Sequence, residues 1–232
     1  MKKNVFFCLL TAVLMIAATG MLSSCDNVKK SGEKVGDCEL FEQDGLQGLK
    51  DSTGQVVLTP KYAKIEEVAA YKAIFATAEP DGATTILIGG YPAVEDVVID
   101  SIVPTNLPEY VYIHSQKTGV YLWKTGTSSV IGPFTDIKLI DDIVFLNADG
   151  LWGAATLQHQ GLAPRKFDKL YIVKNGSTLA VVAYDKNGYA MYDKEGVSDG
   201  VRYDTSSKEL ERELKKLDVT DDIAVIKVTW PL

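Results

Sequence analysis

A strand–turn–strand pattern recurs five times along this 232-residue chain and constrains its fold more than any other feature. Each copy carries a glycine, and successive glycines are 34, 37, 34 and 35 residues apart. They are Gly48, Gly82, Gly119, Gly153 and Gly188. A fixed period of this length is typical of repeat proteins, in which small units stack and no single unit is stable alone.

A large apolar residue recurs in step with the glycines, at intervals of 37, 35, 33 and 36 residues. These anchor residues are Tyr62, Ile99, Phe134, Phe167 and Tyr203. Two markers with one period favour a core shared by neighbouring units over a ligand-contacting surface. Asp-Gly and Asn-Gly pairs, which suit tight hairpin turns, precede the second of three short strands expected in each copy. They are Asp44-Gly45, Asp81-Gly82, Asp149-Gly150 and Asn187-Gly188.

The pattern predicts an all-β fold of about five hairpin units in a closed or nearly closed, propeller-like ring. An open β-solenoid is the alternative. The C-terminal segment Asp222–Trp230 is expected to complete a sheet begun by the first strand, which would remove exposed strand edges. Residues 206–217 carry leucines on one face and predict a short amphipathic helix that caps the array or docks a partner.

The repeat resembles the WG-repeat family, whose consensus is approximately DGKWGYIDKTGKVVIPPKYD. Residues 44–62 match this pattern, and residues 149–168 keep the Trp152-Gly153 pair, Pro164 and Phe167-Asp168. Other residues stand at the remaining tryptophan positions, which the alignment places at Gln47, Asp81, Thr118 and Asn187. The resemblance implies a β-repeat scaffold of the kind common in bacterial envelope proteins.

The first 25 residues have the parts of an export signal: Lys2 and Lys3, an uncharged run over 5–22, and small residues before Cys25. The sequence Leu22-Ser23-Ser24-Cys25 resembles the lipobox of bacterial lipoproteins. This resemblance implies that Cys25 is acylated, for example with palmitate, and becomes the mature N-terminus. An uncleaved transmembrane helix is the alternative, because residues 5–22 are just long enough to span a bilayer.

We therefore divide the chain into a signal peptide (1–24), a lipidated N-terminus and tether (25–37) and a WG-like β-repeat domain (38–232). Removal of Lys2 and Lys3 leaves 22 basic and 31 acidic residues, a formal charge of −9. An acidic chain lacks the basic footprint of a nucleic-acid-binding protein, so we expect no nucleic-acid partner. Cys38 is the only other cysteine of the mature chain and cannot form an internal disulfide.

No motif for catalysis, a cofactor or a metal stands out. His114 and His159 form no ligand pair with each other. Four acidic doublets could supply a pair of carboxylates for glycan hydrolysis, although solvated turns explain them more simply. They are Glu66-Glu67, Glu95-Asp96, Asp141-Asp142 and Asp221-Asp222. The repeated Asp100, Asp136, Asp168 and Asp204 suggest turn capping rather than calcium binding, because each unit offers only one.

These observations predict a non-catalytic, membrane-anchored lipoprotein whose repeat domain binds a protein or glycan of the bacterial cell envelope, with the outer membrane favoured. The alternative is a carboxylate-dependent glycan hydrolase. Aromatic residues are the candidate ligand contacts, with a core position as the competing interpretation. They are Trp123, Trp152, Tyr91, Tyr110 and Tyr112.

Overall fold

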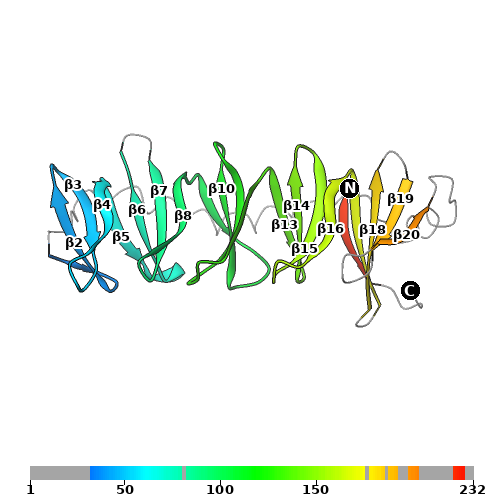
Figure 1. Ribbon diagram of the computed structural model, residues 1–232, viewed down its shortest axis with the longest axis horizontal. Helices are drawn as coiled ribbons and strands as arrows, with labels where there is room; N and C mark the ends of the chain where they lie inside the picture. Colours follow the sequence, from blue (N-terminus) through cyan, green and yellow to red (C-terminus); the bar gives the residue numbers. More distant parts are fainter. Residues whose placement is uncertain are drawn as a thin grey trace, which may run out of the picture. The chain divides into compact units, whose positions relative to one another are not determined.

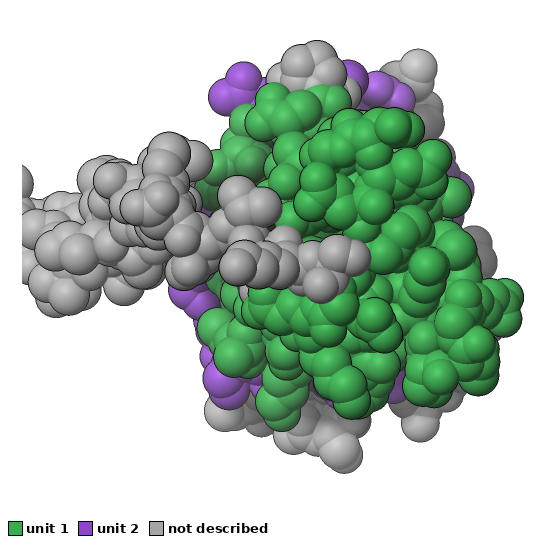
Figure 2. Space-filling view, turned by 90° about the vertical axis from the view of Figure 1, so that its left-hand side faces the viewer, with its two compact units in different colours: residues 1–101 green, residues 102–232 purple. Residues whose placement is uncertain are grey.

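The computed structural model describes residues 32–79, 82–175, 178–185, 188–192, 198–203 and 222–227. These residues form five β-sheets, and the strands of each sheet follow one another along the chain (Figure 1). The chain divides into two compact units, Met1–Ser101 and Ile102–Leu232, which Figure 2 distinguishes by colour. The prediction of an all-β fold built from five repeated units is confirmed.

Unit 1 contains two four-stranded antiparallel sheets. The first consists of β1 (Lys34–Val35), β2 (Cys38–Gln43), β3 (Leu46–Lys50) and β4 (Val56–Tyr62). The second consists of β5 (Lys64–Val68), β6 (Ala73–Thr77), β7 (Ala83–Ile88) and β8 (Tyr91–Val98). A short 3-10 helix, η1 (Ala69–Tyr71), lies between β5 and β6.

The remaining three sheets repeat this order. The third consists of β9 (Ser101–Pro104), β10 (Tyr110–Ser115), β11 (Gly119–Lys124) and β12 (Val130–Phe134). The fourth consists of β13 (Asp136–Ile140), β14 (Ile143–Ala148), β15 (Leu151–Thr156) and β16 (Gly161–Phe167). The fifth consists of β17 (Lys169–Asn175), β18 (Thr178–Asp185), β19 (Gly188–Tyr192), β20 (Ser198–Tyr203) and β21 (Ile223–Lys227).

Four of the five sheets have four strands, one more than the sequence pattern indicated for a repeat, and the fifth sheet has β21 as a fifth strand. In the second to fifth sheets, the additional strand comes first and begins shortly after the last strand of the preceding sheet, as β5 follows Tyr62 and β17 follows Phe167. Ile65 and Leu170 lie on these first strands and are buried. These strands are difficult to recognise because no turn dipeptide separates them from the preceding repeat.

The Asp-Gly turns form as predicted where the structure describes both residues. Asp44 and Gly45 have φ angles of 53° and 79°, and Asp149 and Gly150 have φ angles of 56° and 81°. Two successive residues with positive φ produce the twist that joins antiparallel strands in a two-residue hairpin. The turns connect β2 to β3 and β14 to β15.

The five repeat glycines do not occupy one equivalent structural position. Gly48 and Gly153 lie inside third strands, whereas Gly119 and Gly188 begin them and Gly82 comes just before one. The register shows which residues are equivalent, because Gln47 pairs with Tyr62 and Trp152 pairs with Phe167. By the same criterion, Val120 and Tyr189 are the equivalents of Trp152 in the third and fifth repeats, because they pair with the anchor residues Phe134 and Tyr203. The alignment of Thr118 and Asn187 with Trp152 was therefore wrong by two residues.

The apolar core of unit 1 lies between its two sheets. Leu40 and Leu49 of the first sheet pack in one cluster with Ile65, Ala76 and Leu87 of the second. Tyr62 belongs to this cluster and is 1% exposed. This anchor residue therefore packs in a core shared by two repeats, as the periodicity predicted.

Unit 2 has two clusters of the same kind. One joins the third and fourth sheets through residues such as Leu122 and Val144. The other joins the fourth and fifth sheets and contains Phe145, Phe167 and Ile172. Phe134 is only partly buried against its cluster, and Ile99 follows β8 without being buried, whereas Val97 is buried. The choice of Ile99 as the second anchor was therefore wrong.

The expectation that the C-terminal strand completes a sheet begun by the first strand is wrong. Strand β21 pairs in parallel with β17 from Leu170↔Ile223 to Lys174↔Lys227, while β1 pairs with β2 in the first sheet. Ile223 is 4% exposed and belongs to the core of the fourth and fifth sheets. Pairing with β17 places β21 in the fifth sheet, and burial of the Ile223 side chain stabilises this position.

The first sheet begins earlier than predicted. Lys34 and Val35, which had been assigned to the tether, form β1, and Val35 is completely buried. The predicted helix over 206–217 lies outside the described residues, as do Cys25 and the signal peptide. Among the described residues there is no helix long and apolar enough to cross a membrane. The ring and the open solenoid both remain predictions.

Candidate functional site

Three of the five aromatic residues proposed as ligand contacts are core residues. Trp123, Trp152 and Tyr110 have exposed fractions of 0%, 7% and 8%. The indole N–H of Trp123 donates to the carbonyl oxygen of Thr127 at 2.8 Å. A ligand could not reach these side chains without opening the fold, so they are corrected to structural residues.

Tyr112 also has a structural role. Its side chain is half-buried, and its hydroxyl oxygen accepts a hydrogen bond from the Leu139 N–H at 2.6 Å. Burial raises the pKa of the Tyr112 phenol. The contact joins β10 to β13 and so connects the third sheet to the fourth.

Tyr91 differs from the other four because 75% of its surface is exposed. It begins β8 directly after the turn formed by Gly89 and Gly90, which have φ angles of 55° and 82°. This turn presents the side chain at one end of the second sheet. Tyr91 is the predicted contact residue that the structure leaves accessible.

Tyr91 lines a groove in unit 1 with a volume of about 600 Å³. The first sheet contributes the β1–β2 turn at Gly36–Cys38, the β3–β4 turn around Asp51, and Val56-Val57. The second sheet contributes Glu67, the segment Lys72–Ile74, Leu87 and the turn Gly89–Pro92. The groove therefore lies between turns and strand ends of both sheets.

The groove has an acidic lining. Its charged side chains are Asp37, Asp51, Glu67 and Lys72. The carboxylate of Asp51 accepts hydrogen bonds from the Thr53 hydroxyl at 2.6 Å and from the N–H groups of Thr53 and Gln55 at 2.8 and 3.0 Å. These bonds, the hydroxyl of Thr53 first among them, lower the pKa of Asp51. The carboxylate thus stays ionised while it closes the β3–β4 turn.

Cys38 lines the same groove but is only 6% exposed. Burial, together with the negative charges of Asp37 and Asp51, raises the pKa of this thiol. A thiol with a raised pKa carries little thiolate near neutral pH and is a weak nucleophile. The environment of Cys38 does not suit covalent catalysis.

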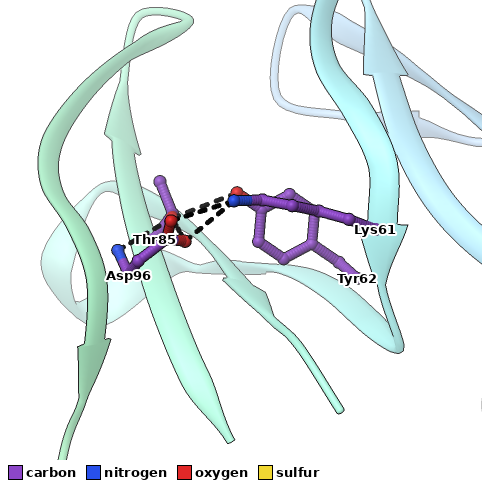
Figure 3. Close-up of polar contacts among 4 residues, drawn as sticks. All are labelled: Lys61, Tyr62, Thr85 and Asp96. Atoms are coloured by element: carbon purple, nitrogen blue, oxygen red, sulfur yellow. Dashed lines mark hydrogen bonds and ion pairs between the residues drawn. The ribbon is translucent and has the colours of Figure 1, made fainter.

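Two of the acidic doublets form ion pairs within unit 1. Figure 3 shows Lys61 of β4 reaching Asp96 of β8, with both Nζ–carboxylate distances at 3.0 Å. The Thr85 hydroxyl donates to Asp96 at 3.2 Å, and the Tyr62 hydroxyl donates to Thr85 at 3.1 Å. The hydrogen bond from Lys61 lowers the pKa of Asp96. These contacts connect the two sheets and hold Asp96 in its charged form.

The doublet Glu66-Glu67 also makes contacts within unit 1. Glu66 pairs with Lys64 at 2.8 Å, and Glu67 accepts a hydrogen bond from the Gly36 N–H at 3.2 Å. A general acid in a glycosidase needs a raised pKa, whereas among the described residues the carboxyl groups of Asp51, Asp96 and Asp142 have lowered pKa values. The doublets Glu66-Glu67 and Glu95-Asp96 take part in contacts that hold the fold, and Asp221 of the fourth doublet lies outside the described residues.

In unit 2, Asp141 and Asp142 face Lys174, whose Nζ lies 3.4 Å and 2.8 Å from their carboxylate oxygens. Desolvation opposes the charge on Lys174, but the hydrogen bonds and charges of Asp142 and Asp141 raise its pKa overall. The ion pair with Lys174 lowers the pKa of Asp142. This cluster connects the β13–β14 turn to β17.

No group of three potential metal ligands exists among the residues that the structure describes. His114 lies on β10 with its ring 6.1 Å from that of Tyr112, and His159 is exposed in a turn with a φ of 66°. The two histidines therefore belong to different local environments.

The sequence did not reveal the groove itself. Asp37, Glu67, Lys72 and Val56 line it, but they come from turns and strands that no motif connects. Tyr91, a candidate contact residue directly after Gly89-Gly90, was the one available signal in the sequence. The pairing of the first two sheets determines which of these segments meet.

No family model matches the chain, and no curated protein matches it. Among solved structures, BamB from Moraxella catarrhalis is 19% identical, with 74% of this chain and 59% of that chain covered and a TM-score of 0.27. The computationally designed Ika8 protein is 17% identical, with 74% and 62% covered and a TM-score of 0.27. The WD40 β-propeller domain of Doa1 is 10% identical, with 72% and 65% covered and a TM-score of 0.25.

The chain spans less than two thirds of the length of each of these three structures. All three TM-scores lie below 0.5, so the similarities assign neither a function nor a closed ring to this chain.

Proposed function

We propose that this protein is a lipid-anchored, non-catalytic binding module of a bacterial cell envelope. The groove of unit 1 is the observation that carries the proposal. It combines a volume of about 600 Å³ with the exposed side chain of Tyr91 and a set of charged residues. Concave sites of this size that hold an aromatic residue and a few polar groups are typical of ligand binding.

We propose a non-catalytic module because the contacts of three acidic side chains favour their ionised form. Asp96 and Asp142 are paired with lysines, and Asp51 closes a turn. Each of these contacts favours the ionised form, which cannot donate a proton to a leaving group. A glycan hydrolase remains the competing function and would require one carboxyl group with a raised pKa.

A membrane anchor is supported by the sequence around Cys25, with the outer membrane favoured. Acyl chains on one cysteine would hold the protein at a bilayer, because each buried methylene contributes about 0.8 kcal/mol. The acidic repeat domain would be repelled by anionic lipid headgroups. We infer that the domain faces the aqueous side, where its groove can meet a protein or glycan of the envelope.

We also infer a relationship to the WG repeats. It is supported by the equivalent places of Gln47 and Trp152 beside their anchors, and by the matching glycines that follow them. A profile built from homologues of this chain would test the relationship. Failure of that profile to align Gly48 and Gly153 with the glycine of the WG pair would contradict it.

Capture of envelope components by the soluble 26–232 fragment tests the binding function. We expect the wild-type fragment to retain a protein or glycan and Tyr91→Ala to retain less of it. Leu151→Ala is the matched control, because Leu151 is an exposed apolar residue of unit 2 at 37%. Equal retention by wild type and Tyr91→Ala would show that the groove is not the binding site.

A glycan-hydrolysis screen with the same fragment tests the alternative function. We expect no turnover. Turnover that disappears with Glu67→Gln or Asp96→Asn, in variants that keep the wild-type thermal unfolding profile, would establish a hydrolase and overturn the proposed function.

A further inference from the structure

We propose that the groove of unit 1 binds a short cationic segment of a partner polypeptide, with lysine or arginine side chains at Asp37 and Glu67 and an apolar side chain against Tyr91. This inference rests on the proposed binding function and specifies the chemistry of the partner. Three features of the groove support the cationic partner: its charge, its pre-positioned carboxylates and its exposed apolar surface.

The charge of the groove selects a cationic ligand. Three carboxylates and one ammonium group line it, which gives a formal charge of −2. Charges of one sign on the walls of a cleft concentrate the field and attract ligands of the opposite sign. Anionic ligands such as nucleic acids and acidic lipids are disfavoured, and neutral sugars gain nothing from this field.

Two of the carboxylates are held in position before a ligand arrives. Asp51 is fixed by the β3–β4 turn, and Glu67 of β5 accepts a hydrogen bond from Gly36 across the two sheets. Asp37 follows Gly36 and is exposed. Groups that are already placed lose little conformational entropy on binding, so their charge is available at low cost.

The groove also carries the accessible apolar surface of unit 1. Tyr91 and Val56 are 75% and 45% exposed, and in the described part of this unit they are the exposed large apolar side chains. They come from different sheets and both line the groove. A tyrosine offers a large apolar surface and can also contact a cation with its ring. A polypeptide can supply a cation and an apolar side chain from neighbouring residues.

Binding of defined peptides to the mature chain tests this inference. The chain would carry Cys25→Ser so that it stays in solution. The probe is a fluorescent hexapeptide, Lys-Leu-Ser-Lys-Leu-Ser, followed by fluorescence anisotropy. The comparison probes are the same peptide with glutamate for lysine, the same peptide with serine for leucine, and a neutral chito-oligosaccharide. We expect the lysine–leucine peptide to bind tightest and to weaken as salt screens the carboxylates.

Removing a negative or a positive charge from the groove should change the affinity for the lysine–leucine peptide in opposite directions. Asp37→Asn combined with Glu67→Gln removes two charges without changing side-chain size, and we expect about tenfold weaker binding. Lys72→Asn removes the only cation of the lining, and asparagine suits its φ of 51°, so we expect about threefold tighter binding. A gain in affinity cannot result from misfolding. Glu42→Gln, an exposed carboxylate outside the groove, is the matched control and should bind as wild type.

Tyr91→Ala should weaken binding of the lysine–leucine peptide about threefold, and Leu151→Ala should leave it unchanged. The inference is overturned if the glutamate peptide binds as well as the lysine peptide, if Lys72→Asn weakens binding, or if no peptide binds.

The oligosaccharide arm separates this inference from the proposed function. Binding of the neutral sugar that Tyr91→Ala abolishes and the carboxylate variants leave intact would overturn the cationic ligand and keep the binding module. Peptide binding with the expected charge dependence, in a protein that retains no envelope component, would keep the groove assignment and contradict the envelope function.

Discussion

At the scale of single residues, Gly48 and Gly153 are required because the fourth strand of their sheet passes close above them. A Cβ on Gly153 would lie 2.9 Å from the Cα of Arg165, and one on Gly48 would lie 2.7 Å from the carbonyl oxygen of Leu58. The register explains this approach, since three residues of the fourth strand lie opposite one glycine in each case. Such a bulge bends the strand over its partner.

Gly153→Ala should therefore destabilise the protein by about 1–3 kcal/mol, the range expected when atoms are forced into a filled space. Urea unfolding measures the change. Gly161→Ala is the control, because a Cβ there meets nothing within 4 Å, and it should stay within about 0.5 kcal/mol of wild type. Equal effects of the two substitutions would show that the close approach at Gly153 does not exist.

The Lys61–Asp96 pair should make stability depend on pH. Lys61 lowers the pKa of Asp96 below 3.8, so the pair stabilises the fold above that value and loses its effect as the pH falls through the folded pKa. Both side chains are about half exposed, at 48% and 56%, which limits the contribution to about 0.2–1 kcal/mol.

Asp96→Asn should lower the midpoint of urea unfolding at about pH 7, and this difference from wild type should shrink at a second, more acidic pH as the wild-type carboxyl also becomes protonated. A double-mutant cycle with Lys61→Met isolates the ion pair from the hydrogen bond of Thr85. A coupling energy that is the same at both pH values would refute the electrostatic explanation.

At the scale of elements, four of the five sheets place a proline in their fourth strand: Pro60, Pro92, Pro133 and Pro164. The fourth strand forms one edge of each of these sheets. Proline lacks an N–H group and is tolerated at an edge, where it also discourages pairing with other chains. These prolines mark the last strand of a repeat more reliably than the glycines mark the third.

The position of β21 can be tested through Ile223, which is buried in the core between the fourth and fifth sheets. Ile223→Ala should destabilise the protein by about 2–4 kcal/mol, because it leaves a cavity among packed side chains. Thermal unfolding monitored by circular dichroism measures the loss.

Val103→Ala is the matched control for Ile223, since Val103 is 39% exposed and should change stability by less than about 0.5 kcal/mol. An unchanged melting temperature for Ile223→Ala would mean that the C-terminal strand is not packed on β17.

At the scale of the whole molecule, the proposed protein has an apolar lipid anchor and an acidic repeat domain. The mature chain carries a formal charge of −9, which opposes adsorption to an acidic bilayer, so attachment would depend on Cys25. The groove lies in unit 1, which includes the N-terminal segment that leads to Cys25.

Cys25→Ser should move the protein from the membrane fraction to the soluble fraction and abolish incorporation of a palmitate analogue. Cell fractionation and metabolic labelling measure these two effects. Cys38→Ser, at a buried cysteine in unit 1, is the control and should retain both membrane attachment and label. Membrane attachment that survives Cys25→Ser would favour the uncleaved transmembrane helix.

The all-β class, the number of repeats, the Asp-Gly turns and the burial of Tyr62 and Phe167 could all be predicted from the amino-acid sequence. These features depend on local chemistry and on a period that repeats within the chain. The sequence did not indicate the first strand of each repeat, the true equivalents of Trp152, or the partner of the C-terminal strand, because strand pairing depends on residues far apart in the chain.

The candidate site shows the same division. Sequence reasoning found five aromatic residues, but only the packing of the sheets decided that Trp123, Trp152 and Tyr110 are core residues and that Tyr91 is exposed. The groove exists because turns and strand ends of two sheets meet around Tyr91. Burial and concavity are properties of surfaces brought together in space, so they follow from the packing of the sheets and not from any local sequence pattern.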